Sequence, residues 1–206
     1  MENAEFDRAL VASAFKLAGE EGWRRVTVAE AARRGGLKLD RARARCPTRA
    51  MLLLRFGRLA DQAALAEAVR DASPRDRLFD LLMRRLDVLQ AHRAGVLALL
   101  RWLPCAPAAA ALLACANLGS MRWMLDGAGI DSQGLRGRLR AKGLLAVWLW
   151  TVRAWQADES EDLAATMAAL DQALRRAERV EQWLRGAQAA GPATPTPSAE
   201  PPPSPV

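Results

Sequence analysis

Apolar residues recur every three or four positions along most of this sequence, in segments that are separated by glycine and proline. Residues 6–21 show the pattern at Phe6, Leu10, Ala14 and Leu17, and Gly22 follows directly. Such spacing places the apolar side chains on one face of a helix, which a glycine commonly ends. The chain is rich in the strong helix formers alanine, leucine and arginine, and β-branched residues are sparse. The sequence therefore predicts an all-α fold.

Helix start signals divide the chain into about nine helices. Thr27, with Glu30 three residues later, predicts the capping box of a short second helix that ends near residue 34. Asp40 is expected to cap a third helix over 41–45, and Thr48 to cap a fourth that reaches about residue 69. The remaining helices are expected at 75–91, 93–103, 108–125, 135–158 and 160–184.

The order of these helices predicts three parts. Residues 1–47 hold a helix followed by two short helices around a glycine-containing turn, which is typical of a helix-turn-helix domain. Residues 48–185 are expected to form a C-terminal helical bundle for ligand binding and dimerisation. Residues 186–206 consist mostly of proline, alanine, glycine, serine and threonine, and are expected to be a disordered tail.

Positive charge is concentrated in one segment of the chain. The net charge is +7, and residues 24–55 contain ten Lys or Arg against the acids Glu30 and Asp40. The rest of the chain is therefore close to neutral. Such a block favours a polyanionic partner, because Lys and Arg release counterions from nucleic acid. A solvated surface in an arginine-rich protein gives the same composition.

Cysteine content and hydropathy favour a cytoplasmic protein. Cys46, Cys105 and Cys115 are odd in number and lack metal-ligand spacing, so we expect reduced, structural thiols. The acidic N-terminus is unlike a signal peptide. The longest nearly unbroken apolar run, 144–152, is much shorter than the roughly 20 residues of a membrane span, so no transmembrane segment is expected.

The N-terminal part resembles the DNA-binding domain of TetR-family transcriptional regulators over about residues 5–60. The resemblance is carried by ALVASAFKL (9–17), EEGW (20–23), VTVAEAA (26–32), GL (36–37), and CPTR (46–49) followed by Leu52 and Leu53. It implies a homodimeric regulator that binds double-stranded DNA and responds to a ligand. Two positions depart from the family pattern: Arg43 replaces the aromatic residue of the recognition helix, and Cys46 replaces a phenylalanine.

Most of the chain also resembles, in patches, the lipid-binding accessory proteins of ubiquinone biosynthesis, which share the TetR fold. The matching stretches are RLAD (58–61), DRL (76–78), RRL (84–86), LL (99–100), RAKGL (140–144), WQADES (155–160) and TMAALD (166–171). The usual Asp-Phe-Asn-Trp-Tyr stretch of those proteins is not matched at 130–134. This resemblance implies an isoprenoid lipid as ligand and a vestigial helix-turn-helix.

The DNA-binding candidates lie in and beside the expected third helix: Thr27, Lys38, Arg41, Arg43, Arg45, Thr48 and Arg49. Arg41 and Arg45 are four residues apart, so they are expected to share the outward face and to contact guanine edges. Arg43, Lys38 and Arg49 are expected to contact phosphates. Alanine at all three helix arginines should keep the fold, because alanine suits exposed helix positions.

Two further sets of residues are expected in the C-terminal bundle. An apolar ligand pocket is predicted from Met83, Trp102, Met121, Trp123, Met124, Trp148 and Trp155, although ordinary core packing explains the same residues. A dimer interface is predicted from the 4–3 spacing of Leu163, Met167, Leu170, Leu174 and Ala177. An intramolecular core gives the same spacing.

No pattern of catalytic residues stands out, so an enzyme is not expected, and neither is a cofactor or a metal site. The single histidine, His92, is expected to be a surface cap at a helix junction. The acids at 158–162 are explained by a helix start, where negative charge is favourable. The sequence thus predicts a TetR-type DNA-binding regulator. The alternative is a TetR-fold lipid-binding accessory protein for ubiquinone biosynthesis.

Overall fold

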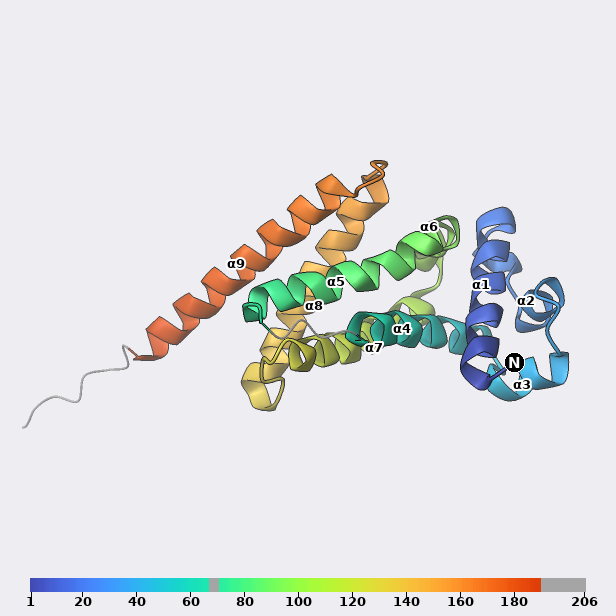
Figure 1. The fold of residues 1–206 in the computed structure, drawn as a ribbon, viewed down its shortest axis with the longest axis horizontal. Helices are drawn as coiled ribbons and strands as arrows, with labels where there is room; N and C mark the ends of the chain where they lie inside the picture. The colour runs from blue at the N-terminus through green and yellow to red at the C-terminus, as the bar shows by residue number, and fades with distance from the viewer. Residues whose placement is uncertain (67–70, 190–206) are drawn as a thin grey trace, which may run out of the picture.

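A computed structural model describes residues 1–66 and 71–189, and within these ranges every regular element is a helix (Figure 1). The α-helices are α1 (Asn3–Glu21), α2 (Val28–Arg34), α3 (Leu39–Arg45), α4 (Arg49–Leu65), α5 (Pro74–Ala91), α6 (Arg93–Trp102), α7 (Pro107–Gly127), α8 (Gly134–Ala157) and α9 (Ala164–Ala189). Short 3-10 turns lie at Trp23–Arg25 (η1) and Leu103–Cys105 (η2). The predicted all-α fold with about nine helices is confirmed.

The helices α1, α2 and α3 form one end of the molecule, and α4 to α8 form the bundle beside them (Figure 1). The helix α9 packs along α8 and also contacts α5. One continuous cluster of buried apolar side chains runs from Phe6 in α1 to Leu174 in α9. The three-helix unit is therefore docked on the bundle through shared core packing.

Several helix boundaries are fixed by side-chain caps, and the sequence predicts two of these, Thr27 and Thr48. The backbone N–H of Glu30 donates to Thr27 Oγ1, and those of Met51 and Asp76 donate to the hydroxyls of Thr48 and Ser73. These bonds satisfy amide groups that have no partner inside the helix. At the end of α1, Gly22 takes a φ of 83°, a conformation that favours glycine.

Two predicted starts were wrong. Helix α3 begins at Leu39 with Lys38 in the capping position, so Asp40 lies in its first turn and does not cap it. Helix α9 begins at Ala164, four residues after the predicted start. Asp158 causes the delay, because its carboxylate accepts hydrogen bonds from the N–H and hydroxyl groups of both Ser160 and Thr166. Those bonds hold the pKa of Asp158 well below its ordinary value.

The crossing of α1 and α6 depends on a glycine. A Cβ atom built on Gly95 would lie 2.1 Å from the backbone oxygen of Phe15, so only glycine lets α6 approach α1 this closely. His92 lies directly before α6, half-buried, with its ring 5.9 Å from that of Phe15 and 5.8 Å from that of Phe56. The predicted surface cap was wrong: His92 makes no capping bond, and burial lowers its pKa.

Helix α4, which follows the predicted boundary at residue 47, contacts α1 as well as α5 and α7. These contacts do not separate the two predicted domains, and the domain boundaries remain predictions. Of the predicted tail, residues 186–189 continue α9, and residues 190–206 lie outside the described residues. The last residues predicted for the fourth helix, 67–69, also lie outside them. The predicted run 144–152 is part of α8.

Helix α7 is the one described helix that is long and apolar enough to cross a membrane by length and composition, with a mean hydropathy of 1.2. Only 22% of its most apolar stretch is buried. It packs against α4, α5 and α8, which is the arrangement of a bundle helix.

All three cysteines are free thiols. Cys46 is buried beneath α3, and burial raises the pKa of its thiol. Cys105 and Cys115 are also free, as predicted, but they are exposed, so burial gives these two no structural role.

Candidate functional site

The candidate site is the pair of helices α2 and α3, whose turn is built by two glycines. The amide of Gly35 donates to Ala31 O, and that of Leu37 donates to Ala32 O, which closes α2. Gly36 takes a φ of 62°, which favours glycine. Ala42 is buried on the inner face of α3, whereas Asp40 and Ala44 on the opposite face and Leu39 and Arg43 on its sides are exposed.

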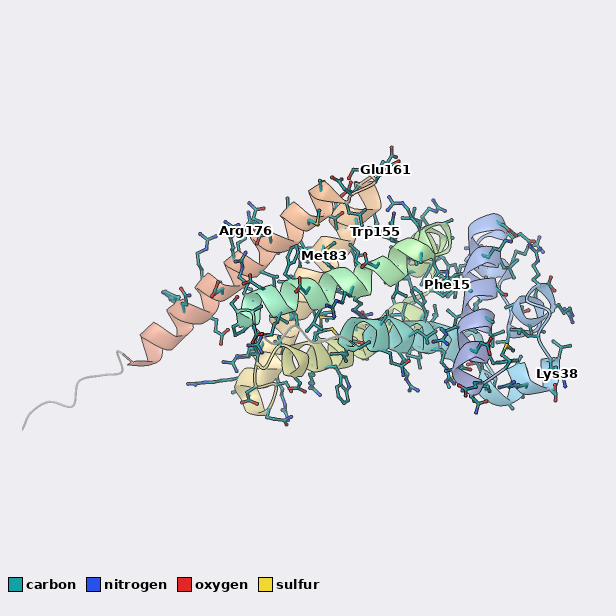
Figure 2. The ribbon with its side chains drawn as sticks, viewed as in Figure 1. Phe15, Lys38, Met83, Trp155, Glu161 and Arg176 are labelled. Carbon is teal, nitrogen blue, oxygen red and sulfur yellow. The ribbon has the colours of Figure 1, made fainter. Side chains whose placement is uncertain are left out.

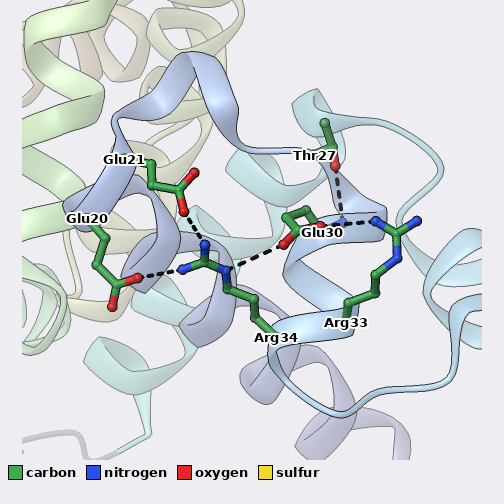
Figure 3. A network of polar contacts seen from close by, with 6 residues as sticks. All are labelled: Glu20, Glu21, Thr27, Glu30, Arg33 and Arg34. Carbon is green, nitrogen blue, oxygen red and sulfur yellow. Dashed lines mark hydrogen bonds and ion pairs between the residues drawn. The ribbon is translucent and has the colours of Figure 1, made fainter.

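The cations of α2 are engaged by acids of α1 and of α2 itself (Figure 3). Arg34 contacts Glu20 at 2.6 Å, and it also contacts Glu21 and Glu30. Arg33 lies 3.0 Å from Glu30. The pairs tie α2 to the end of α1, and they neutralise part of the positive charge that the sequence concentrates in this segment.

Arg45 points inward, which corrects the prediction that it shares an outward face with Arg41. Its guanidinium donates to both carboxylate oxygens of Asp7 at 2.5 Å, and its side chain is only 24% exposed. Arg55 of α4 donates to the same carboxylate at 2.6 Å and to the backbone oxygen of Arg45 at 3.2 Å. The buried Asp7 thus joins α1, α3 and α4, and Arg45 is a structural residue in this conformation.

Arg41 and Arg49 are also held by the protein. Arg41 donates to Met1 O at 3.0 Å and to Asn3 Oδ1 at 2.9 Å, and its guanidinium lies 4.5 Å from the centre of the Phe6 ring. Arg49 donates to Trp23 O at 3.2 Å and lies over the ring of Trp102 at 4.9 Å. Both side chains are partly buried, so neither extends freely from the surface.

Four of the seven predicted DNA-binding residues are exposed: Thr27, Lys38, Arg43 and Thr48. Arg43 donates one hydrogen bond to Pro47 O at 3.1 Å, and Lys38 stands at the outer end of the molecule (Figure 2). Exposed cations close to them in sequence are Arg24 and Arg25, whereas the exposed Arg33 is paired with Glu30. These side chains leave a basic surface that can contact phosphate oxygens, and α3 adds one long donor, Arg43, for base edges.

The predicted pocket residues do not form one group. Trp102 packs against Trp23 beside α1, with their ring centres 6.4 Å apart, and Trp123 is 64% exposed on α7. Met121, Met124, Trp148 and Trp155 are buried in the bundle, and Met83 is partly buried against its core. A guanidinium covers each of the two buried tryptophans in this set, Arg85 over Trp148 and Arg93 over Trp155.

The predicted dimer residues lie mostly inside the chain. Leu163, Leu170 and Leu174 are buried where α9 packs on α8 and α5, and Met167 is partly buried. Only Ala177 is exposed. The spacing therefore belongs to an intramolecular seam at these leucines, which corrects their assignment to a dimer interface.

Sequence reasoning missed Asp7 and Arg85. Both are charged residues on otherwise apolar helix faces, and each is among the buried polar residues of the described chain. A charge at a core-facing helical position is the signal that could have found them. Among the described residues, no group of three His, Cys, Asp or Glu side chains is placed to hold a metal ion.

We expect Arg45→Ala to lower the free energy of unfolding by about 1.5–3 kcal/mol, because it removes two charge-assisted bonds to the buried Asp7. Arg43→Ala should change it by less than about 0.5 kcal/mol, as for an exposed position. Urea unfolding of both variants measures the difference. Equal stabilities would show that the Asp7 pair does not hold α3. The earlier expectation that all three arginines are dispensable for folding is therefore withdrawn for Arg45.

No protein-family model matches the sequence, and no curated protein matches it either. Solved structures do match. The TetR transcriptional regulator from Nitrosomonas europaea superposes with a TM-score of 0.69 at 24% identity, over 85% of this chain and 99% of that one. A transcriptional regulator from Rhodococcus sp. gives 0.58 at 20% identity, over 84% and 96%. A TetR-family transcriptional regulator from Streptomyces coelicolor gives 0.57 at 19% identity, over 93% and 92%. The chain has the fold of TetR-family regulators.

Proposed function

We propose that this protein is a cytoplasmic, homodimeric DNA-binding regulator of the TetR kind, a binding protein and not an enzyme. The observation that carries the proposal is the exposed basic surface of a helix-turn-helix unit, with Lys38 and Arg43 on α3 between the capped starts of α2 and α4. The matched structures include regulators with this fold, which supports the same function.

The proposal assigns a role in DNA binding to each of the exposed residues. Lys38 and Arg43 neutralise phosphates, and Arg43 is also the residue that reaches a base edge in the major groove. Thr27 and Thr48 stand at helix N-termini, where hydroxyl and amide donors suit a phosphate oxygen. Arg45, through Asp7, fixes the tilt of α3. Most of the affinity then comes from the DNA backbone, and sequence selectivity rests on few contacts.

We expect duplex DNA to bind with an affinity that falls linearly with salt on logarithmic axes. The double variant Lys38→Ala/Arg43→Ala should reduce the slope by roughly two per subunit, and therefore by roughly four for the homodimer, because each lost phosphate contact removes about 0.9. Fluorescence anisotropy on a library of genomic fragments measures both. As a control of equal charge, Arg58→Ala/Arg122→Ala changes exposed arginines of α4 and α7 and should leave the slope unchanged. Binding that prefers no fragment over bulk DNA at low salt would refute the regulator.

The proposed dimer interface is the outward face of α8 together with the end of α9. Large apolar side chains stand exposed there: Leu135, Leu139, Leu149, Trp150, Val180 and Trp183. On α8 the first four fall within one stripe at helical spacing, and Ala146 lies between them. A second copy covers such a stripe when each partner presents the same patch. Ala177 lies one turn before Val180 and belongs to this surface.

Trp150→Glu should convert the dimer to folded monomers, because Trp150 is 51% exposed and its substitution leaves the core of one chain intact. Leu170→Glu should instead unfold the chain, because Leu170 is fully buried. Sedimentation with circular dichroism separates the two effects. Ala168→Glu, an exposed site elsewhere on α9, is the matched control. A wild-type chain that stays monomeric at micromolar concentration would disprove the dimer.

Effector binding, as proposed, acts through the bundle. A ligand that favours one arrangement of α5 and α6 changes DNA affinity, because α6 lies against α1 at Gly95. By linkage, DNA then changes the affinity for the ligand by the same factor.

Two observations favour a second candidate, a lipid-binding accessory protein of ubiquinone biosynthesis. All three α3 arginines donate hydrogen bonds to the protein itself, and α7 and α8 expose apolar side chains that include Trp123. A vestigial helix-turn-helix would keep the fold without contacting DNA, while the bundle would hold an isoprenoid lipid.

A gene deletion distinguishes the two candidates. We expect changed transcripts and an unchanged quinone content, with transcripts restored by the wild-type gene and not by Lys38→Ala/Arg43→Ala. The accessory role gives the reverse: depleted quinone, a wild-type transcriptome, and full rescue of quinone by the same double variant. RNA sequencing and quinone extraction from the same cultures provide both measurements.

A further inference from the structure

His92 is the one residue that separates α5 from α6, and its ring lies between two further helices. The ring centre is 5.9 Å from that of Phe15 on α1 and 5.8 Å from that of Phe56 on α4. The rings of Phe15 and Phe56 are themselves 4.1 Å apart. Phe15 lies at the boundary between α1 and the bundle (Figure 2). These three rings, which we call the aromatic joint, therefore lie where the three-helix unit docks on the bundle.

The aromatic joint offers His92 no charged partner. Burial alone lowers the pKa of His92 below its ordinary value of about 6.5, without a contribution from another charge. The charged side chains nearest in sequence to the three rings are exposed or otherwise engaged: Lys16, Glu20, Arg58 and Asp87 are exposed, Arg55 donates to Asp7, and Arg93 donates to backbone oxygens of α8.

A proton on His92 weakens the aromatic joint. A neutral imidazole packs between phenylalanine rings without a charge to solvate, whereas an imidazolium loses part of its hydration there. The two phenylalanine faces offset little of this cost, because both ring separations lie at the limit of about 6 Å for a cation over an aromatic ring.

The direction of the pKa shift fixes the direction of the pH dependence. Because the pKa of His92 is lowered by folding, the folded chain binds the proton more weakly than the unfolded chain does. The stability that the neutral ring contributes is therefore fully present above about pH 6.5. It is lost as the pH falls from about 6.5 toward the lower pKa of the folded chain.

The helix crossing beside His92 has no slack. A Cβ atom built on Gly95 would lie 2.1 Å from the backbone oxygen of Phe15, and one built on Gly19 would lie 2.9 Å from Ala94 Cβ. The backbones of α1 and α6 are thus already in contact. If the charged ring turns toward water, it leaves a space beside Phe15 that closes only when α1 shifts on α6.

We propose that His92 is an acid-sensitive switch: a proton on its ring loosens the docking of α1 on α6 and thereby weakens DNA binding. The effect on DNA rests on the proposed function, and it follows because α3 is joined to α1 through Arg45 and Asp7. The effect on stability does not depend on DNA.

The full chain allows a direct test, because His92 is its only histidine. Few other side chains titrate between pH 7.5 and 5.5. Proton NMR follows the ring C–H signals, and we expect a titration midpoint below about 6.5. In urea, the unfolding equilibrium constant should rise about threefold to tenfold from pH 7.5 to 5.5, where about tenfold is the limit for one histidine. Affinity for duplex DNA, measured by fluorescence anisotropy over the same range, should fall about threefold or more.

His92→Phe is the matched control, because it places a neutral ring of similar size in the aromatic joint. Its unfolding constant and its DNA affinity should change by less than about 1.5-fold over the same pH range. His92→Gln, which is neutral and smaller, serves the same purpose if phenylalanine overpacks the joint.

Three results would overturn the switch: an NMR midpoint at or above about 6.5, a wild-type DNA affinity that does not fall at pH 5.5, or a pH dependence that both variants retain. A chain that binds no DNA at either pH refutes the regulator. The NMR midpoint and the unfolding data then decide the acid sensitivity of the aromatic joint on their own.

Discussion

The contact of Asp7 with Arg45 and Arg55 determines how the three N-terminal helices are presented. It joins the first turns of α1, the last residue of α3 and the middle of α4 through one buried carboxylate. A buried carboxylate needs compensation, and two guanidiniums supply it from different helices. The orientation of α3 is therefore set by an interaction that also removes one of its arginines from solvent.

Arg45 shows which contacts can be predicted from the sequence and which cannot. The caps at Thr27 and Thr48 were predictable, because each depends on residues only three positions apart. The partner of Arg45 lies 38 residues away, so no local pattern places it. Helical spacing identified the leucines of α9 as apolar seam residues, but spacing does not distinguish a partner within the chain from one in a second copy.

Two surfaces of different chemistry are candidates for the binding surface of this protein. The basic end around Lys38 and Arg43 suits a polyanion, whereas the exposed apolar residues of α7, α8 and α9 suit a protein or lipid partner. The homodimer that we propose would cover the α8 and α9 part of the apolar surface. The exposure of Trp123 on α7 is not explained by that interface. This exposed side chain is one of the two observations that favour the accessory role.

The packing gives a continuous route between the buried Arg85, which lies over Trp148, and α3. Arg85 lies on α5, α6 follows α5 directly, and α6 crosses α1 at Gly95, where backbone meets backbone and there is no space to absorb a displacement. Helix α1 carries Asp7, which holds α3. A close-packed interior transmits displacement better than a loose one. Continuity alone does not establish coupling, however, since two sites are coupled only if a ligand binds two arrangements with different affinity. For a regulator the displacement must reach α3. For an accessory protein, the bundle needs only to hold its ligand. The tight α1–α6 crossing is therefore a requirement of the regulator alone.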